Sequence, residues 1–386
     1  QSWKAEKKPW ISHPLPKISA DAKLLENFAK NLPEQGILSI GRIPPTSIST
    51  VKKLAKDLAW PVFADIASGL RLGPEFPNRV TYYDQLLIDS DYLKSHPPQK
   101  VIHLGFAPTS KRWLREMEKL PADTLVWIKE GSSRLDPTNR FRSVFETSVE
   151  DFCSEMISKL KKRKKSEWTI HWLDQSNKIE KLMEQFITNH SLFSEMKLVR
   201  TLTKIIPESH ALFLGNSLPV REVDFYGSGN GSEVKVGLNR GASGIDGLVA
   251  SSAGYSKGLN QPLTLLLGDL SLLHDLNSLK LISESPKPIV LIVLNNHGGG
   301  IFSFLPVSEH KDIFETYFST PHSLEFKDAA KMFKLSYFNP ESPEEFESIY
   351  LKQASADKSC IIEVNTLKED NIRVQKEWTE FLHQNR

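Results

Sequence analysis

Hydrophobic and polar positions along this chain follow two different periods. Short runs rich in Ile, Val and Leu, at residues 263–267 and 288–294, are too brief for helices and are typical of buried parallel strands. Between them, residues 275–285 repeat their apolar positions with helical spacing and stop at Pro286. This segment predicts a strand–helix–strand unit, and the two strands of such a unit end at the same edge of one sheet.

The same alternation runs through the rest of the 386 residues. It predicts the α/β fold class, with two doubly wound parallel-sheet domains at residues 20–165 and 166–386. Residues 1–19 are polar and contain several prolines, and we interpret them as a linker that follows a further domain. The expected strands are 35–42, 61–65, 100–106, 124–130, 210–215, 233–238, 263–269, 288–295, 335–338 and 360–365, and the expected helices are 20–32, 47–60, 110–120, 170–186, 194–206, 275–285, 328–333, 343–354 and 371–384.

Composition and charge argue against several classes of function. A net charge of +2 gives no broad field for nucleic acid, and no apolar run approaches the roughly 20 residues of a membrane span. Cys153 and Cys360 form neither a disulfide framework nor a C-x-x-C metal motif, which is consistent with a reducing compartment. The basic run at residues 159–165 indicates a solvated helix end before an interdomain linker rather than a nucleic-acid contact.

Common catalytic motifs are also missing from the sequence. The expected strands of the first domain lack a G-x-G-x-x-G turn, which does not support a nicotinamide or flavin site. Ser243 lies in GASGI rather than in the G-x-S-x-G elbow of hydrolases. His274 and His297 follow the two central strands, but we interpret both as surface or packing residues rather than as proton-transfer groups.

The two central strands end in oxygen-bearing side chains, Asp269 after the first and Asn296 after the second. One carboxylate and one amide suit a hard cation such as Mg²⁺, which completes its octahedron with phosphate oxygens and water. The helix that begins at Leu270 and Ser271, and the glycine turn at residues 298–300, are expected to offer free backbone N–H groups to those phosphates. The sequence therefore predicts a site for Mg²⁺ and a diphosphate.

These residues resemble a known signature. Gly268-Asp269 followed by Asn295-Asn296 resembles the thiamine diphosphate (ThDP) motif of the decarboxylase and synthase superfamily, except that Leu270 replaces the usual glycine. GDLSLLHDLNSL and NNHGGGIFSFLP are similar to one branch, the 2-succinyl-5-enolpyruvyl-6-hydroxy-3-cyclohexene-1-carboxylate (SEPHCHC) synthase family, MenD. ILSIGR, AWPVFADIASGLR and SRLDP also resemble the middle domain of that family.

The resemblance implies roles for individual residues. Ile245 would support the bent cofactor, and Arg221 and Arg240 would hold substrate carboxylates. The alternatives are core packing for Ile245 and Phe302, surface ion pairs for the arginines, a helix cap at Asn216 or Ser217, and an exposed helix start for Lys111. The implied cofactor residues are Ser217, Ile245, Gly268, Asp269, Leu270, Ser271, Asn296, Gly298, Gly299 and Ile301; the metal ligands are Asp269, Asn296 and Gly298; and the substrate residues are Arg221, Arg240, Phe302 and Lys111.

The resemblance also implies a reaction and partners. The reaction would be ThDP- and Mg²⁺-dependent decarboxylation of 2-oxoglutarate, with addition of the succinyl carbanion equivalent to isochorismate in menaquinone or phylloquinone biosynthesis; Mn²⁺ could replace Mg²⁺. The catalytic glutamate of the family belongs to an N-terminal pyrimidine-binding domain for which we find no counterpart here, so we expect this chain alone to be inactive. A dimer or tetramer in the cytoplasm, or in a plastid, is the expected setting.

Two other readings remain open. The chain could be another ThDP-dependent 2-oxo acid decarboxylase or synthase, although Leu270-Ser271 and residues 239–247 favour the SEPHCHC synthase family. It could also be a non-catalytic cofactor-binding or assembly subunit. The complete Asp269 and Asn296 pair and both arginines argue against such a loss of function.

Overall fold

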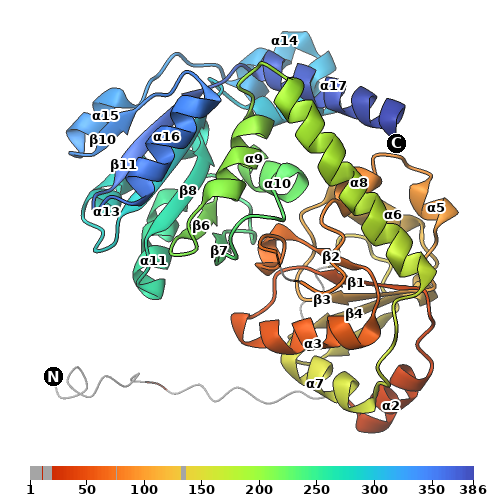
Figure 1. Ribbon diagram of the computed structural model, residues 1–386. Coiled ribbons are helices and arrows are strands. Elements are labelled where there is room, and N and C mark those ends of the chain that lie inside the picture. Colours follow the sequence, from red (N-terminus) through yellow and green to blue (C-terminus); the bar gives the residue numbers. More distant parts are fainter. Residues whose placement is uncertain (1–10, 12–19, 75, 132–135) are drawn as a thin grey trace.

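The computed structural model describes residues 11, 20–74, 76–131 and 136–386, so most of the expected linker and part of the SRLDP motif lie outside the described residues. Two separate β-sheets form the framework, and helices flank each of them (Figure 1). Every strand pair in both sheets is parallel. The predicted α/β class with two parallel sheets is therefore confirmed.

The first sheet has the strand order β2-β1-β3-β4-β5. Its first four strands match the predicted ones, whereas β5 was not predicted because it is short and mostly exposed and therefore lacks an apolar run. The strands are β1 (Gly36–Ile40), β2 (Val62–Ala64), β3 (Lys100–Leu104), β4 (Leu125–Lys129) and β5 (Ser143–Glu146), and the helices around them are α2 (Ala22–Lys30), α3 (Ile48–Leu58), α4 (Tyr83–Leu86), α5 (Tyr92–Ser95), α6 (Lys111–Lys119) and α7 (Val149–Lys159), with 3₁₀ turns η1 (Pro45–Ser47), η2 (Ile66–Ser68) and η3 (Ala122–Thr124).

The second sheet has six strands in the order β10-β11-β9-β8-β6-β7. All six were predicted, and β8 and β9 are buried along almost their whole length. The strands are β6 (Ala211–Leu214), β7 (Val236–Leu238), β8 (Leu263–Gly268), β9 (Ile289–Asn295), β10 (Ser336–Phe338) and β11 (Cys360–Asn365); the helices are α8 (Glu167–Asn189), α9 (Glu195–Ile205), α10 (Leu218–Tyr226), α11 (Leu248–Leu259), α12 (Asp269–His274), α13 (Leu279–Ser283), α14 (Lys311–Phe314), α15 (Lys327–Met332), α16 (Pro343–Ala354) and α17 (Lys368–Asn385); and the turns are η4 (Leu276–Ser278), η5 (Gly300–Phe304), η6 (Pro306–Glu309) and the π-turn η7 (Glu315–Ser319).

The crossover between β8 and β9 differs from its prediction. A single helix over residues 275–285 is wrong, because the chain forms α12, breaks at Asp275, and continues as η4 and α13. Asp275 breaks the helix because its Oδ2 accepts hydrogen bonds from the backbone N–H groups of Val249 and Ala250, at 2.8 and 3.0 Å. Its carboxylate thus satisfies two otherwise unpaired donors at the start of α11. At its other end α12 begins directly after β8, so Asp269 is its first residue.

Two helices that follow residue 165 in the chain cover the core of the first sheet. Trp172 on α8 and Trp378 on α17 belong to one buried cluster with Phe63 and Trp113. The Trp172 and Phe63 rings pack edge to face with centroids 5.3 Å apart. The predicted boundary at residue 165 therefore separates the two sheets, but it does not separate their hydrophobic cores.

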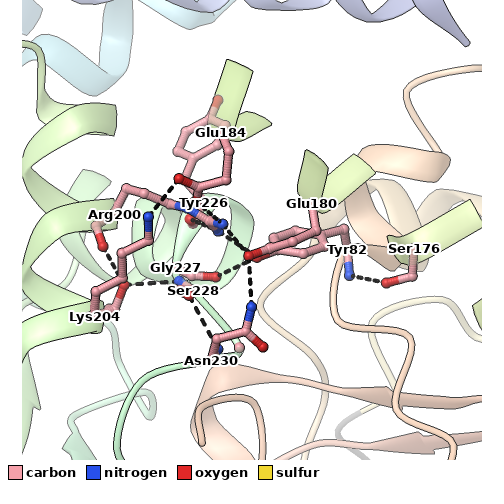
Figure 2. A network of polar contacts seen from close by, with 12 residues as sticks. Tyr82, Ser176, Glu180, Glu184, Arg200, Lys204, Tyr226, Gly227, Ser228 and Asn230 are labelled. Carbon is pink, nitrogen blue, oxygen red and sulfur yellow. Dashed lines mark hydrogen bonds and ion pairs between the residues drawn. The ribbon is translucent and has the colours of Figure 1, made fainter. Parts of the chain in front are cut away.

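A buried arginine links α8 and α9 to the loop before α4. Arg200 on α9 donates to the Tyr82 hydroxyl and to the carboxylates of Glu180 and Glu184 on α8, and these residues are shown in Figure 2. Asn230 extends the network by donating from Nδ2 to Glu180 Oε1 at 3.0 Å. Arg200 is only 1% exposed, so its guanidinium group is shielded from water, whereas its partners Glu180 and Glu184 are partly exposed; the contacts hold the two halves of the molecule together.

Several smaller predictions concern the rest of the chain. Cys153 and Cys360 are buried and free, in agreement with the absence of a disulfide framework. The basic run starts at the last residue of α7 and continues toward α8, and its partly buried Arg163 donates to the carbonyls of Leu32 and Pro33. Within the described residues, no helix combines the length and the apolarity that crossing a membrane requires.

Candidate functional site

The carboxyl ends of β8 and β9 bring Asp269 and Asn296 to one edge of the second sheet. Gly268 of β8 pairs with Leu294 of β9. Asp269 comes one residue after Gly268 and Asn296 two residues after Leu294, so both side chains leave the sheet at neighbouring points of its edge. The backbone N–H of Gly298 donates to Oδ2 of Asp269 at 2.9 Å. The expected convergence of these two strand ends is therefore found.

Asp269 is a buried carboxylate with few cationic neighbours. Its Oδ1 accepts from the Leu270 N–H at 2.6 Å, and Nε2 of His322 lies 3.2 Å from Oδ2 without the alignment of a hydrogen bond. Burial raises the pKa of Asp269, although the two N–H groups and the nearby His322 and His297 act in the opposite direction. A divalent cation would compensate the buried charge and favour the ionised form.

Asn296 presents an unused oxygen at the same edge. Its Nδ2 donates to Oε1 of Glu195 at 3.0 Å, whereas its Oδ1 is shielded from water and has no hydrogen-bond partner. An acceptor left in this state costs about 1–3 kcal/mol. A hard cation would satisfy it, so the donor set fits Mg²⁺.

A metal at this edge would depend on more than acidic side chains. Among the described residues, no group of three or more His, Cys, Asp or Glu side chains is arranged to hold a metal ion. The predicted set of Asp269, Asn296 and Gly298 instead combines one carboxylate, one amide and one backbone carbonyl. Mg²⁺ is typically bound by one or two protein carboxylates, with phosphate oxygens and water at its other positions, which matches this small set.

The glycine turn after β9 differs from its prediction. Its N–H groups are not free, because Gly298 donates to Asp269, Gly299 to the Ser319 carbonyl at 2.6 Å, and Gly300 to the Gly298 carbonyl at 3.0 Å. A Cβ on Gly298, where φ is +149°, would lie 2.3 Å from the Ser319 carbonyl oxygen. These glycines therefore allow close packing against the segment before Thr320, and the prediction that they supply free donors to phosphates is wrong.

The loop after β6 has an unusual backbone. Ser217 adopts φ +72° and ψ −129° at the N-cap position of α10, and its side chain makes no capping hydrogen bond. The alternative of a side-chain cap at Ser217 is therefore wrong. Positive φ at a non-glycine residue is costly and is found preferentially at functional sites. His297 and Ser243, in the loops after β9 and β7, share this feature with φ of +58° each.

Arg221 and Arg240 lie close to each other beside this loop. Arg221 donates to the Ser217 carbonyl at 2.6 Å, and Arg240 lies 3.4 Å from Oδ1 of Asn216. Burial lowers the pKa of Arg221, and the positive charge of Arg240 lowers it further. Two half-buried guanidinium groups that repel each other would be stabilised by an anion between them.

Asp65 shows how this edge lies relative to the first sheet. It follows β2, and the charge of Arg240 acts to lower the pKa of its buried carboxyl, although burial raises that pKa overall. Arg240 therefore lies within electrostatic range of the carboxyl end of the first sheet.

The structure places the remaining predicted residues without testing their roles. Ile245 and Ile301 are partly buried, and the Phe302 ring packs against Phe318 with centroids 5.6 Å apart. Lys111 is the first residue of α6 and is exposed, in agreement with the alternative interpretation of Lys111 as an exposed helix start. Gly268 ends β8, and Leu270 and Ser271 belong to α12, so their cofactor contacts stay predictions. The Leu270 N–H donates to Oδ1 of Asp269, so the prediction that it is free for a phosphate is wrong.

Sequence reasoning missed the groups behind Asn296. Glu195 is fully buried and binds Asn296, yet in the sequence it is an ordinary acidic residue in the first turn of a helix. Thr366 directly follows β11 and donates to the same carboxylate, so strand-end reasoning applied to β11 could have found it. His322 comes from an irregular segment and gave no local signal.

Comparison with known proteins gives the class of this chain. Residues 1–214 match the protein family described as the middle domain of thiamine pyrophosphate, which covers more than half of the chain. The chain therefore belongs to the family of thiamine pyrophosphate enzymes, in agreement with its two parallel sheets and its Asp269 and Asn296 edge.

Within that family, the sequence is similar to proteins named 2-succinyl-5-enolpyruvyl-6-hydroxy-3-cyclohexene-1-carboxylate synthase. The one from Rubrobacter xylanophilus is 37% identical over 345 residues, which is 89% of this chain and 60% of the relative. Those from Chlorobium phaeobacteroides and Salinibacter ruber are 35% and 33% identical over 96% and 97% of this chain, and 64% of each relative is covered. The chain thus spans somewhat less than two thirds of the length of these relatives.

Proposed function

We propose that this chain provides the diphosphate- and metal-binding part, and two substrate-binding arginines, of a ThDP-dependent SEPHCHC synthase. Such an enzyme would decarboxylate 2-oxoglutarate and join the remaining succinyl unit to isochorismate. The observation that carries the proposal is the unpartnered Oδ1 of Asn296 beside the buried carboxylate of Asp269. The similarity to named SEPHCHC synthases supports the choice of reaction.

The metal and the cofactor would be held at the edge of the second sheet. Asp269, the Asn296 amide and the Gly298 carbonyl would bind Mg²⁺, with Mn²⁺ as a possible substitute, and the metal would bind the diphosphate. Ser217 and the start of α12 would lie along the same diphosphate. When bound, ThDP supplies the electron sink that decarboxylation of a 2-oxo acid requires.

The side chains of this chain would act by binding and by excluding water. Both substrates carry carboxylates, and Arg221 and Arg240 would hold them by paired charge-assisted hydrogen bonds. Ile245, Ile301 and Phe302 would form the apolar wall of the pocket. Such a wall keeps water away from the reacting atoms and strengthens the electrostatic interactions inside the site.

The proposed reaction would also need a pyrimidine-binding domain that contributes a glutamate. That domain would come from another segment of the protein or from another subunit, which makes a homo-oligomer part of the proposal. Calorimetric titration of the chain with ThDP, with and without Mg²⁺ and with and without a pyrimidine-domain polypeptide, tests the binding step. Consumption of 2-oxoglutarate that depends on isochorismate tests the reaction, and ThDP binding that ignores Mg²⁺ would contradict the proposal.

Substrate preference separates this proposal from the other two readings. Turnover of pyruvate in preference to 2-oxoglutarate would favour another ThDP-dependent decarboxylase or synthase. Cofactor binding without turnover of any 2-oxo acid, in the presence of the pyrimidine domain, would favour a non-catalytic assembly subunit. The two adjacent arginines favour the dicarboxylate substrate, because a monocarboxylate would leave one guanidinium without a partner.

A further inference from the structure

The amide of Asn296 has a donor end and an acceptor end, and only one orientation suits a cation. In the structure Nδ2 donates to Glu195 Oε1 at 3.0 Å, and Oδ1 is left without a partner. If the amide turned over, its NH₂ group would face the metal position and would repel a cation. The group that fixes this orientation therefore decides whether Asn296 can act as a ligand.

Glu195 is placed to fix the orientation of the Asn296 amide. It is the first helical residue of α9, directly after the N-cap Ser194, and its side chain is fully buried. Its Oε1 also accepts from the Thr366 hydroxyl at 3.0 Å, and its Oε2 accepts from Nδ2 of Asn371 at 3.0 Å. Both carboxylate oxygens of Glu195 thus accept from side-chain donors, and it is the NH₂ end of Asn296 that faces them.

Glu222 on α10 supports this arrangement from behind. It is buried and shares the Asn371 amide, whose Nδ2 donates to Glu222 Oε1 at 3.2 Å and to Glu195 Oε2 at 3.0 Å. Two neighbouring buried carboxyl groups do not both ionise readily. Burial and the charge of Glu195 hold the pKa of Glu222 well above its ordinary value. The side-chain donors of Asn371 and Thr366 meanwhile point at Glu195, which is the acceptor in both contacts.

We propose that Glu195 is a positioning residue of the metal site, which holds the Asn296 amide so that its oxygen faces the divalent cation. The inference rests on the proposed function, because it concerns the same cation. Four elements meet at this carboxylate: α9 provides it, the end of β9 provides Asn296, the end of β11 provides Thr366, and α17 provides Asn371. The cation site thus depends on residues far from the two strands that carry its ligands.

Two variants separate positioning from general packing. Glu195→Met keeps the side-chain length and removes the acceptor, whereas Thr366→Val removes a different hydrogen bond to the same Oε1 atom. Mg²⁺ and Mn²⁺ affinity at fixed ThDP is measured by calorimetry for both variants, together with the free energy of unfolding. We expect Glu195→Met to weaken metal affinity by about 10–100-fold, the usual effect of losing a group that orients a ligand, and Thr366→Val to change it by less than about threefold.

Each outcome of these measurements bears on a different part of the proposal. Unchanged metal affinity in Glu195→Met, or losses in both variants that follow their losses of stability, would overturn the positioning role. If the wild-type protein, with the pyrimidine domain present, shows no Mg²⁺-dependent ThDP binding, the proposed function itself fails.

A third measurement needs no destabilised variant. Hydrogen exchange of the Asn296 side-chain NH₂, in protein labelled with ¹⁵N-asparagine and assigned by loss of the signal in Asn296→Ala, reports the Glu195 contact directly. We expect strong protection relative to the exposed Asn277. Equal exchange at both positions would overturn the inference even if Glu195→Met does not fold.

Discussion

The backbone N–H of Gly298 lies 2.9 Å from Oδ2 of Asp269, so the loop after β9 is fastened to the residue that begins α12. This bond fixes the direction of the carboxylate relative to the Asn296 amide. It also uses one of the oxygen lone pairs of Asp269 and leaves the others for a cation.

Asp269→Asn should abolish Mg²⁺-dependent ThDP binding and leave the fold intact. The substitution keeps an oxygen that can accept from Gly298 but removes the negative charge that a divalent cation needs. Calorimetric titration with ThDP and Mg²⁺ measures the effect. The exposed His274→Ala, at the end of the same helix, is the control and should bind as the wild type does. Equal cofactor affinity in the two variants would remove the metal assignment.

Arg240→Gln should raise the KM for 2-oxoglutarate or isochorismate in the completed enzyme, with ThDP affinity unchanged. Arg240→Lys should recover only part of the loss, because an ammonium group cannot hold a carboxylate with two parallel hydrogen bonds. Steady-state kinetics together with ThDP titration separate the two effects. Arg142→Gln, at a guanidinium that is exposed on the first sheet, is the control. Loss of ThDP binding in Arg240→Gln would show that this arginine serves the cofactor instead.

The stability of Asp224→Asn relative to the wild type should increase as the pH rises. Asp224 Oδ1 accepts from the Ile66 N–H at 2.8 Å, its Oδ2 has no partner, and burial followed by the charge of Asp65 holds its pKa well above the ordinary value. The folded state therefore keeps a proton that the unfolded state releases near pH 4, and stability falls by up to about 1.4 kcal/mol per pH unit between that pH and the folded pKa.

The asparagine variant has no such proton to release, and its amide oxygen can still accept from Ile66. Urea unfolding at pH 5 and pH 8 should show the difference between variant and wild type growing in favour of the variant. The exposed Asp312→Asn serves as the control and should follow the wild-type curve. Parallel pH dependence of Asp224→Asn and wild type would contradict a raised pKa at Asp224.

Arg200→Met should lower the free energy of unfolding by about 3–5 kcal/mol, because it leaves Glu180 and Glu184 without their buried partner. Lys204→Ala removes an ion pair to the same Glu184 from a position that is 41% exposed, and it should cost less than about 1 kcal/mol. Chemical unfolding of both variants provides the comparison. Similar losses would show that the buried network of Figure 2 contributes no more than a surface pair.

The sequence predicted the periodic parts of this fold and missed the parts set by tertiary contacts. The expected strands appear because buried parallel strands are continuous apolar runs, and the convergence of Asp269 and Asn296 follows from parallel topology alone. The break at Asp275 could not be predicted, since its cause is a carboxylate that caps a different helix. Glu195 was hidden for a similar reason, because its importance lies in burial and not in any local pattern.

The glycine turn shows how one motif can be located correctly and explained incorrectly. Residues 298–300 were expected beside Asp269, and Gly298 donates to that residue. Their N–H groups, however, bind Asp269, Ser319 and Gly298, so the need for glycine comes from backbone packing. The sequence shows that Gly298 has no side chain. Only the structure shows that the Ser319 carbonyl occupies the space that a side chain would need.

The Trp172 and Trp378 rings, from α8 and α17, fill the core of the first sheet. A polypeptide that ended at residue 165 would therefore leave Phe63 and Trp113 facing water and would tend to aggregate rather than fold. The two sheets are expected to melt in a single cooperative step, because each loses part of its hydrophobic interior when the other unfolds. Any exchange of one sheet between related enzymes would have to carry these two helices with it.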